Sequence, residues 1–208
     1  MDIFNEIKTI IFDFDGVIID SMEVRDYGFR KIFEKYSENK VEELIKYHRE
    51  NGGLSRFHKI KHFYNNIINS NIEDDDVMNY ANKFSLIMRD ELVKEKYLIK
   101  EWANFIRENK NKYTMHIASG SEEKELRYLC ENLGISKYFN SIHGSPTHKN
   151  ELVKQIIESN NYNKENIVLI GDSINDYEAA RINNIKFIGY NNTELESLGD
   201  AYLESVLF

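Results

Sequence analysis

The 208-residue chain has only one cysteine, one proline and one tryptophan. A lone cysteine, Cys130, forms no intrachain disulfide, so we expect a fold that does not depend on an oxidising compartment. Basic residues are the minority, 27 against 35 acidic ones, and a net charge of −8 provides no global attraction for nucleic acid or an anionic membrane. Long uncharged apolar runs are missing too, which argues against a signal peptide or a membrane span. We therefore expect a cytoplasmic protein that meets any anionic ligand locally, through a metal or a basic pocket.

Short apolar runs, most of them rich in β-branched residues, alternate with helical patterns of about ten residues. This alternation is typical of right-handed βαβ units and predicts an α/β fold, with a Rossmann-like parallel sheet covered on both faces. The expected strands are residues 8–12, 113–118, 167–170 and 185–188, and the expected helices between them are residues 122–132, 150–159 and 174–183. Residues 20–95 differ, because their apolar residues recur at helical spacing and indicate a helical insert after the first strand.

Two aspartates, Asp13 and Asp15, come directly after the first expected strand and are followed by Gly16. The carboxyl ends of parallel strands are where α/β folds bind ligands, so one carboxylate can attack a substrate while the other handles protons. Glycine lets the chain turn sharply and approach a ligand closely. Taken alone, two aspartates that cap a turn explain the same residues.

Two more carboxylates, Asp172 and Asp176, follow the most apolar expected strand, residues 167–170. Together with Asp13 they would form an all-oxygen site that suits Mg²⁺ better than zinc. Asp172 by itself is equally explained as a helix N-cap. Two acidic strand ends in one sheet would repel each other unless a cation joined them, which favours the metal interpretation.

Ser119 and Gly120 end another expected strand, where a hydroxyl and a backbone N–H can meet a phosphate oxygen. An ordinary serine N-cap is the simpler alternative. Lys149 precedes an expected helix and could neutralise a phosphoryl group or keep a nucleophilic carboxylate charged. A solvated surface lysine is the alternative there.

In order and separation, these four sites resemble the four motifs of the haloacid dehalogenase superfamily of phosphotransferases. Residues 13–17 are similar to its first motif, Ser119 to its second, Lys149 to its third, and Gly171, Asp172 and Asp176 to its fourth. The sequence after Asp15 is similar to the subgroup of phosphoglycolate phosphatases and β-phosphoglucomutases. This resemblance implies a Rossmann-like catalytic core over residues 1–19 and 96–208, with a helical cap domain over residues 20–95.

The resemblance also implies a mechanism for phosphate ester hydrolysis. Asp13 would attack phosphorus and form an aspartyl-phosphate, while Asp15 would protonate the leaving alcohol and later deprotonate water. Mg²⁺ would be held by Asp13, Asp172 and the Asp15 backbone carbonyl, with Asp176 as a ligand or a support. Ser119, the Gly120 amide and Lys149 would clamp the phosphate.

Two positions bear on the type of reaction. Dehalogenating members of the superfamily lack the second aspartate of the first motif, so Asp15 favours phosphoryl transfer. Arg25 stands where β-phosphoglucomutases carry a histidine, which favours a phosphatase over a phosphosugar mutase. The mutase remains one alternative, and a catalytically idle binding protein of the same fold is another.

One segment, residues 46–64, is conspicuously basic, with five Lys or Arg residues against one Glu. By resemblance to capped relatives, its Gly52–Gly53 turn would face the catalytic aspartates, and Arg49, Arg56 and Lys59 would contact a carboxylate or second phosphate of the substrate. A solvated basic helix face is the alternative. The expected partner is a small phosphorylated metabolite, a sugar phosphate or a phosphoglycolate-like acid, bound by a monomer or weak dimer.

Overall fold

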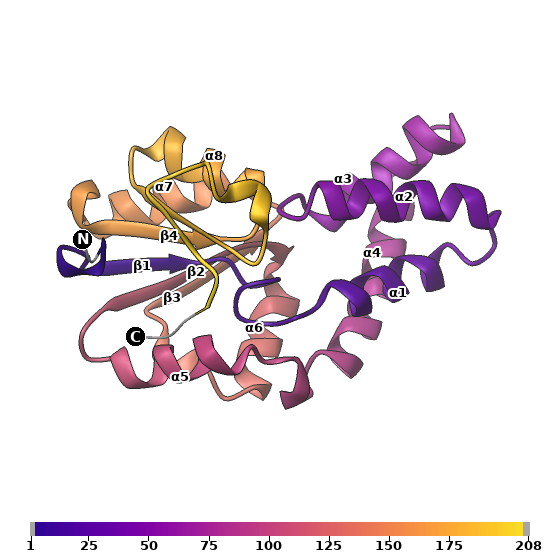
Figure 1. Ribbon diagram of the computed structural model, residues 1–208. Coiled ribbons are helices and arrows are strands. Elements are labelled where there is room, and N and C mark those ends of the chain that lie inside the picture. Colours follow the sequence, from indigo (N-terminus) through magenta and orange to yellow (C-terminus); the bar gives the residue numbers. More distant parts are fainter. Residues whose placement is uncertain (1–2, 206–208) are drawn as a thin grey trace.

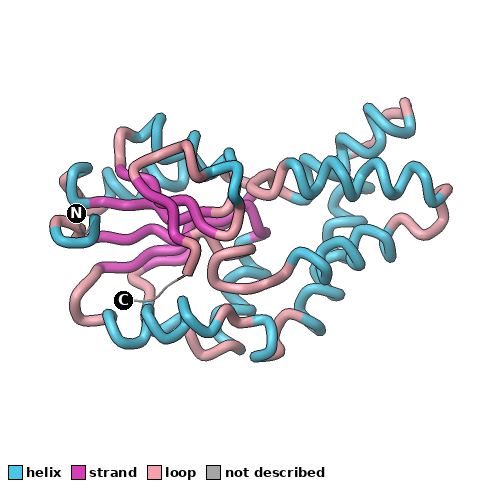
Figure 2. Tube along the Cα trace, viewed as in Figure 1, coloured by secondary structure: helices cyan, strands magenta, loops and turns pink. Residues whose placement is uncertain are grey.

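The computed structural model describes residues 3–205, and within them six strands form one sheet with the order β3-β2-β1-β4-β5-β6. Every pair of neighbouring strands is parallel, and Figures 1 and 2 show the sheet at the centre of one half of the molecule. The strands are β1 (Thr9–Phe12), β2 (Thr114–Glu122), β3 (Ser141–Ser145), β4 (Ile167–Gly171), β5 (Lys186–Tyr190) and β6 (Ala201–Leu203). The predicted α/β class with a Rossmann-like parallel sheet is confirmed.

Helices cover both faces of this sheet, which is why the central strands β1 and β4 are buried along their whole length. Successive side chains of β1 enter different cores, because they alternate across the sheet. Ile11 packs with α7 (Lys149–Ser159) and α8 (Ile174–Asn183), and Ile10 and Phe12 belong to the core that includes α5 (Lys100–Asn109) and α6 (Glu123–Asn132). Figure 1 shows these helix pairs on opposite sides of the sheet.

The helical insert lies beyond the carboxyl ends of the strands (Figure 1). It contains α1 (Met22–Ile32), α2 (Glu38–Glu50), α3 (Arg56–His62), which continues as a π-helix over Phe63–Ile68, and α4 (Asp74–Glu91). The two chain segments that join it to the sheet half are hydrogen-bonded to each other: the Ile99 N–H donates to the Ile18 carbonyl, and the Asp20 N–H donates to the Tyr97 carbonyl. The division into a core and a cap that act as separate domains stays a prediction.

The sequence prediction was wrong about the length of β2 and missed two strands. β2 continues through Ser119 and Gly120 to Glu122, and the Glu122 side chain caps α6 by accepting from the Glu125 N–H. Ser119 is therefore not a helix N-cap. β3 was missed because its sequence lacks the apolar run of a central strand, and β6 because it is only three residues long.

Several smaller expectations concern burial and local structure. Cys130 is fully buried and unpaired, as a structural thiol should be. Ser55 caps α3 by accepting from the His58 N–H, directly after the Gly52–Gly53 turn. Each helix within residues 3–205 is too short or too polar to traverse a bilayer.

Candidate active site

The strand order reverses beside β1, because the chain passes from β1 to β2 and β3 on one side and then returns to β4 on the other. Such a switch point leaves a crevice at the carboxyl ends of the strands. Asp13 follows β1 and Asp172 follows β4, and the Asp13 N–H donates to the Ile170 carbonyl at 2.9 Å. Gly16 has φ +78°, and a Cβ atom there would collide with the Asp172 carboxylate. Only glycine allows this loop to lie so close to the second strand end.

Three carboxylates meet in the crevice: one oxygen each of Asp13, Asp172 and Asp176 lies within 4.8 Å of the others. Lys149 at the start of α7 donates to Asp13 Oδ1 at 2.7 Å and also to Asp176 Oδ1. The Asp13, Asp176 and Lys149 side chains are at least 95% buried. The structure thus brings together four of the residues that the sequence singled out, from three separate motifs.

The cluster carries more negative charge than its single lysine can balance. Burial raises the pKa of Asp13 to about 7, and the charges of Asp176 and Asp15 add to that effect, although Lys149 opposes it. Burial, with Asp13 and Asp176, also raises the pKa of Asp172 well above its usual range. The pKa of Lys149 rises despite its burial, because Asp13 and Asp176 stabilise the ammonium. A divalent cation fits this donor set, since carboxylate oxygens are its preferred ligands and its charge removes the repulsion.

Asp176 is the most constrained of the three. Its Oδ2 accepts from the Ser173 N–H at 3.0 Å and from the Ser173 hydroxyl at 2.6 Å, which forms a capping box at the start of α8. The N-cap residue is therefore Ser173, and the interpretation of Asp172 as an N-cap is wrong. With both oxygens already engaged, Asp176 is better placed to orient Lys149 than to bind a metal directly.

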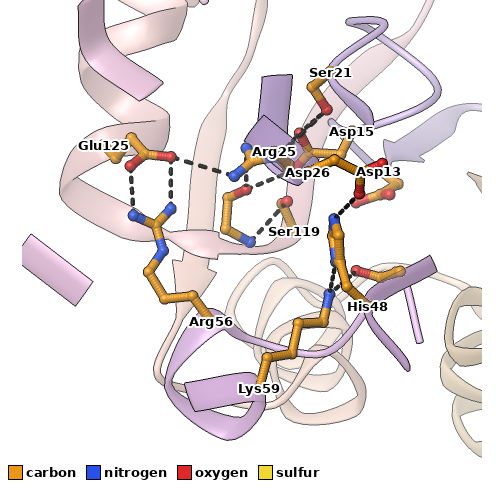
Figure 3. A network of polar contacts seen from close by, with 12 residues as sticks. Asp13, Asp15, Ser21, Arg25, Asp26, His48, Arg56, Lys59, Ser119 and Glu125 are labelled. Atoms are coloured by element: carbon orange, nitrogen blue, oxygen red, sulfur yellow. Dashed lines mark hydrogen bonds and ion pairs between the residues drawn. The ribbon is translucent and has the colours of Figure 1, made fainter. Parts of the chain in front are cut away.

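Asp15 is not part of this three-carboxylate group and lies in a separate hydrogen-bond network (Figure 3). It accepts from Arg25 Nε at 2.6 Å, Ser21 Oγ at 2.5 Å and Ser121 Oγ at 2.6 Å. Burial works to raise its pKa, but the Arg25 charge and the hydrogen bonds from Ser121 and Ser21 outweigh burial and lower it. The two aspartates of one motif thus have opposite pKa shifts, which is the arrangement that two different catalytic roles require.

Arg25 extends this network to Glu125, a fully buried carboxylate on α6. Its Nη2 donates to Ser121 at 2.8 Å, and its Nη1 lies 3.5 Å from Glu125 Oε1. Arg56 of α3 makes a bidentate pair with the same carboxylate, with both distances 2.6 Å (Figure 3). Residues of the helical insert therefore reach the core through two buried arginines.

The phosphate-binding candidates lie on the strand that continues past its expected end. The buried Ser119 hydroxyl accepts from the Ser121 N–H at 3.1 Å, while Gly120 and Ser121 line the adjoining pocket. A Cβ on Gly120 would overlap the Gly53 carbonyl oxygen, so this glycine allows the turn of the insert to contact the strand directly. The Gly52–Gly53 turn does face the carboxyl ends of the strands.

The pocket above the aspartates is bounded by both halves of the molecule. Of the three basic candidates in the insert, Arg56 and Lys59 line it and Arg49 does not. The Arg49 side chain is 56% exposed and forms an ion pair with Asp26 at 2.5 Å. The contribution of the insert to the lining is Ser21, Met22, Arg25, Phe29, His48, Gly52, Leu54, Arg56, Lys59 and Phe84.

Sequence reasoning assigned no role to Ser21, Asp26, His48, Ser121 and Glu125. A signal existed for Glu125, because it precedes the buried Leu129 by one helical turn and so lies on the inward face of α6. Asp26 likewise precedes the buried Phe29 by three residues on α1. Both lie in charge-rich stretches that are typical of solvated helix surfaces, so the sequence alone does not single them out.

Comparison with known proteins agrees with this architecture. The sequence model of a family described as haloacid dehalogenase-like hydrolase matches residues 10–190. A 5'-nucleotidase of Pseudomonas aeruginosa is 27% identical over 82 residues, which is 37% of this chain and 37% of that protein.

Solved structures with low sequence identity share the fold. A β-phosphoglucomutase from Clostridium difficile has a TM-score of 0.76 at 18% identity, covering 96% of this chain and 92% of the other. A predicted phosphoglycolate phosphatase from Haemophilus somnus has a TM-score of 0.74 at 15% identity, covering 97% of this chain and 96% of the other. CbbY from Rhodobacter sphaeroides, solved with xylulose-1,5-bisphosphate, has a TM-score of 0.77 at 16% identity, covering 96% of this chain and 95% of the other.

Proposed function

The chain belongs to the haloacid dehalogenase-like hydrolases, and from this membership and its site we propose that it is a Mg²⁺-dependent phosphatase of small phosphorylated metabolites. The observation that carries the proposal is the pair of aspartates at the end of β1. Asp13 is bonded to Lys149 within the carboxylate cluster, while Asp15 is held apart by Arg25 and two serines. This arrangement supplies a nucleophile and a separate acid–base group at one point.

In the first step Asp13 attacks phosphorus in line, a P–O bond forms to its carboxylate, and the bond to the leaving oxygen breaks. Lys149 assists because its ammonium, 2.7 Å from Asp13 Oδ1, favours the ionised nucleophile against the effect of burial. In the second step Asp15 takes a proton from water, which attacks the aspartyl-phosphate and releases phosphate.

Asp15 is ionised in the ligand-free site, which suits its role as the base in hydrolysis. Its earlier role, donation of a proton to the leaving alcohol, needs a higher pKa. A bound phosphate dianion raises the pKa of a neighbouring carboxyl, so substrate binding would itself prepare Asp15 to act as the acid.

Mg²⁺ would be held by the Asp13 and Asp172 carboxylates and the Asp15 backbone carbonyl, with Asp176 orienting Lys149. When bound, the ion supplies positive charge beside the transferring phosphoryl oxygens and balances the carboxylate cluster. The Ser119 hydroxyl, the Gly120 N–H and Lys149 would bind the phosphoryl group, and Ser121 would keep Asp15 in place.

The leaving part of the substrate would lie in the pocket beside Arg56 and Lys59. Two cationic side chains and a limited volume favour a sugar phosphate or a phosphoglycolate-like acid. Arg49 remains outside this proposal as a substrate contact, because it is engaged with Asp26 away from the lining.

The test is phosphate release from a panel of sugar phosphates, phosphoglycolate, nucleotides and an aryl phosphate, with and without Mg²⁺. We expect release that needs Mg²⁺ and that falls at least a thousandfold in Asp13→Asn, because the nucleophile is lost while the side chain keeps its shape. Unchanged turnover in that variant would contradict the proposal. Isomerised hexose phosphate without free phosphate would identify a mutase, and binding without any conversion would identify an idle binding protein.

A further inference from the structure

Lys59 of α3 is buried at the edge of the pocket, 2% exposed, and its ammonium group is only partly used. Its Nζ lies 2.8 Å from His48 Nδ1 and 3.3 Å from the Gly52 carbonyl oxygen (Figure 3). An ammonium has three N–H donors and no acceptor. One donor is therefore left for a ligand in the pocket.

The other cations near the reacting centre are already paired with carboxylates. Arg56 is neutralised by Glu125, Arg25 by Asp15 and Glu125, and Lys149 by Asp13 and Asp176. Among the pocket-lining side chains that the structure describes, Lys59 is the cation with no carboxylate within ion-pair distance. When protonated, Lys59 therefore offers an anionic group of a substrate a positive charge that no protein carboxylate neutralises.

His48 stands directly behind Lys59. Its ring is 3% exposed, packs against Phe29 with the ring centroids 4.9 Å apart, and stays neutral because burial and the nearby Lys59 lower its pKa well below the usual range. To accept from Lys59 at Nδ1, a neutral imidazole must carry its proton on Nε2. A neutral acceptor holds the ammonium in place and leaves its charge available.

Asp26 lies beyond His48, on the side of the ring opposite Lys59. Its Oδ1 faces His48 Nε2 at 3.8 Å, and within residues 3–205 neither atom forms a hydrogen bond. Arg49 fixes the other oxygen of Asp26 with donors at 2.8 Å and 2.5 Å. Because buried polar groups in proteins are normally paired, these two facing atoms are candidate partners for each other.

We propose that Asp26 and His48 are positioning residues that hold the Lys59 ammonium toward the pocket, where it binds an anionic group, a carboxylate or a phosphate, on the leaving part of the substrate. This inference rests on the proposed function and deepens it. It singles out one of the basic residues of the insert as the specificity determinant. It also gives Arg49 a role, which is to hold Asp26 in place.

The charged groups around Lys59 indicate that it takes up a proton when an anion binds. Burial lowers its pKa to about 7, and Arg25 and Arg56 act in the same direction, while Asp15 and Asp172 oppose them. Besides these four groups, the neutral His48 faces it from α2. At pH 8 much of Lys59 is therefore neutral, and an anion binds together with a proton.

The first experiment compares three probes in saturating Mg²⁺: phosphoglycolate for the carboxylate source, fructose 1,6-bisphosphate for the phosphate source, and phenyl phosphate, whose leaving part is uncharged. In Lys59→Met and His48→Leu we expect the KM of at least one anionic probe to rise tenfold or more relative to that of phenyl phosphate. His48→Asn keeps an acceptor near the Nδ1 position and should recover most of the loss. Asp26→Asn should lie between these extremes.

The matched control is His58→Asn, because His58 is an exposed histidine of α3, the helix that carries Lys59, and it contacts Tyr47 outside the pocket lining. It should leave the KM ratio unchanged. An equal loss for all three probes in His48→Leu would assign a merely structural role and overturn the proposal, as would the absence of any selective loss in Lys59→Met.

The second experiment separates this inference from the proposed function. Calorimetric binding of phosphoglycolate and fructose 1,6-bisphosphate at pH 8, in two buffers of different ionisation enthalpy, counts the protons taken up. The intact chain should take up a fraction of a proton with at least one probe, and Lys59→Met should take up none. If no probe is hydrolysed, the phosphatase proposal fails, but the difference in proton uptake between the intact chain and Lys59→Met still tests the role of Lys59. Equal proton uptake by the two proteins would rule out anion binding by Lys59.

Discussion

At the scale of single residues, Arg25 shows how one side chain sets the chemistry of another. Its planar guanidinium reaches Asp15, Ser121 and Glu125 at once, which a lysine ammonium on a flexible stem cannot do with the same geometry. Because its charge lies 2.6 Å from Asp15, it keeps that half-buried carboxylate ionised. The resting state of the acid–base group is thus determined by a residue of the helical insert.

Replacing Arg25 should therefore change the pH dependence as well as the rate. In Arg25→Met the pKa of Asp15 rises, since burial is no longer opposed by a neighbouring charge, and the acidic limb of kcat/KM moves to higher pH. We also expect kcat to fall on the order of a hundredfold through misplacement of Asp15. Arg25→Lys keeps the charge and should move the limb less. A pH profile of Arg25→Met that coincides with that of the intact protein would show that Asp15 is not the group that titrates.

At the scale of elements, the contact between α3 and α6 joins the insert to the sheet half. Arg56 and Glu125 are both buried, the pair is bidentate, and the Arg56 guanidinium lies 4.7 Å from the centre of the Phe84 ring. A buried ion pair gains little net stability over apolar residues, but a buried charge left without its partner is costly. The pair consequently makes the docking of α3 on α6 specific.

Removing one partner of the Arg56–Glu125 ion pair should destabilise the protein much more than replacing both partners by apolar residues. We expect Glu125→Gln to lower the free energy of unfolding by about 3–5 kcal/mol, because Arg56 and Arg25 then lose their shared countercharge. Arg56→Met combined with Glu125→Leu should cost less than the sum of the single changes. Urea unfolding of the intact protein, Arg56→Met, Glu125→Leu and the double variant gives the coupling energy. The pair Arg127–Glu123 on the surface of α6 is the control, and Glu123→Gln should cost less than about 1 kcal/mol. Additive losses at Arg56 and Glu125 would contradict the expected coupling.

At the scale of the whole molecule, the carboxylate cluster links folding to pH and to metal. The pKa of Asp13 is raised from its unfolded value of 3.8 to about 7, and that of Asp172 is raised as well. Between these pH values the folded chain binds more protons than the unfolded chain, so without metal its stability falls as pH rises. A cation that binds only the folded state offsets this loss.

Thermal unfolding should therefore respond to Mg²⁺, and more strongly at pH 8 than at pH 5. At a concentration a hundred times Kd the ion contributes about 2.7 kcal/mol, which corresponds to roughly 5–10 °C in Tm for a chain of this size. Chelation by EDTA should reverse the gain. Asp172→Asn should weaken the Mg²⁺ response and make the metal-free protein less sensitive to rising pH. The same Mg²⁺ gain at both pH values would show that the cluster is not the binding site.

Local sequence determined where the reactive groups stand along the chain. Asp13 and Asp172 follow short apolar runs that predict the ends of strands, and Lys149 precedes an expected helix, so each position was predictable without knowledge of the rest of the fold. Parallel strands end at one edge of a sheet, so the meeting of these residues followed from the α/β pattern itself. The helical character of residues 20–95 followed in the same way from apolar spacing.

Tertiary structure alone decided what each helix face meets. Helical spacing indicates that Glu125 and Asp26 lie on inward faces, but not that their partners are Arg56 and Arg49, which come from other helices. It equally could not separate Arg49, which is turned to the surface, from Lys59, which is buried at the pocket. The extension of β2 past Ser119 likewise depends on pairing with β3, a strand with no strong signal of its own. Periodicity is a property of one segment, whereas burial and ion pairing are properties of two segments in contact, and only the packed chain brings those segments together.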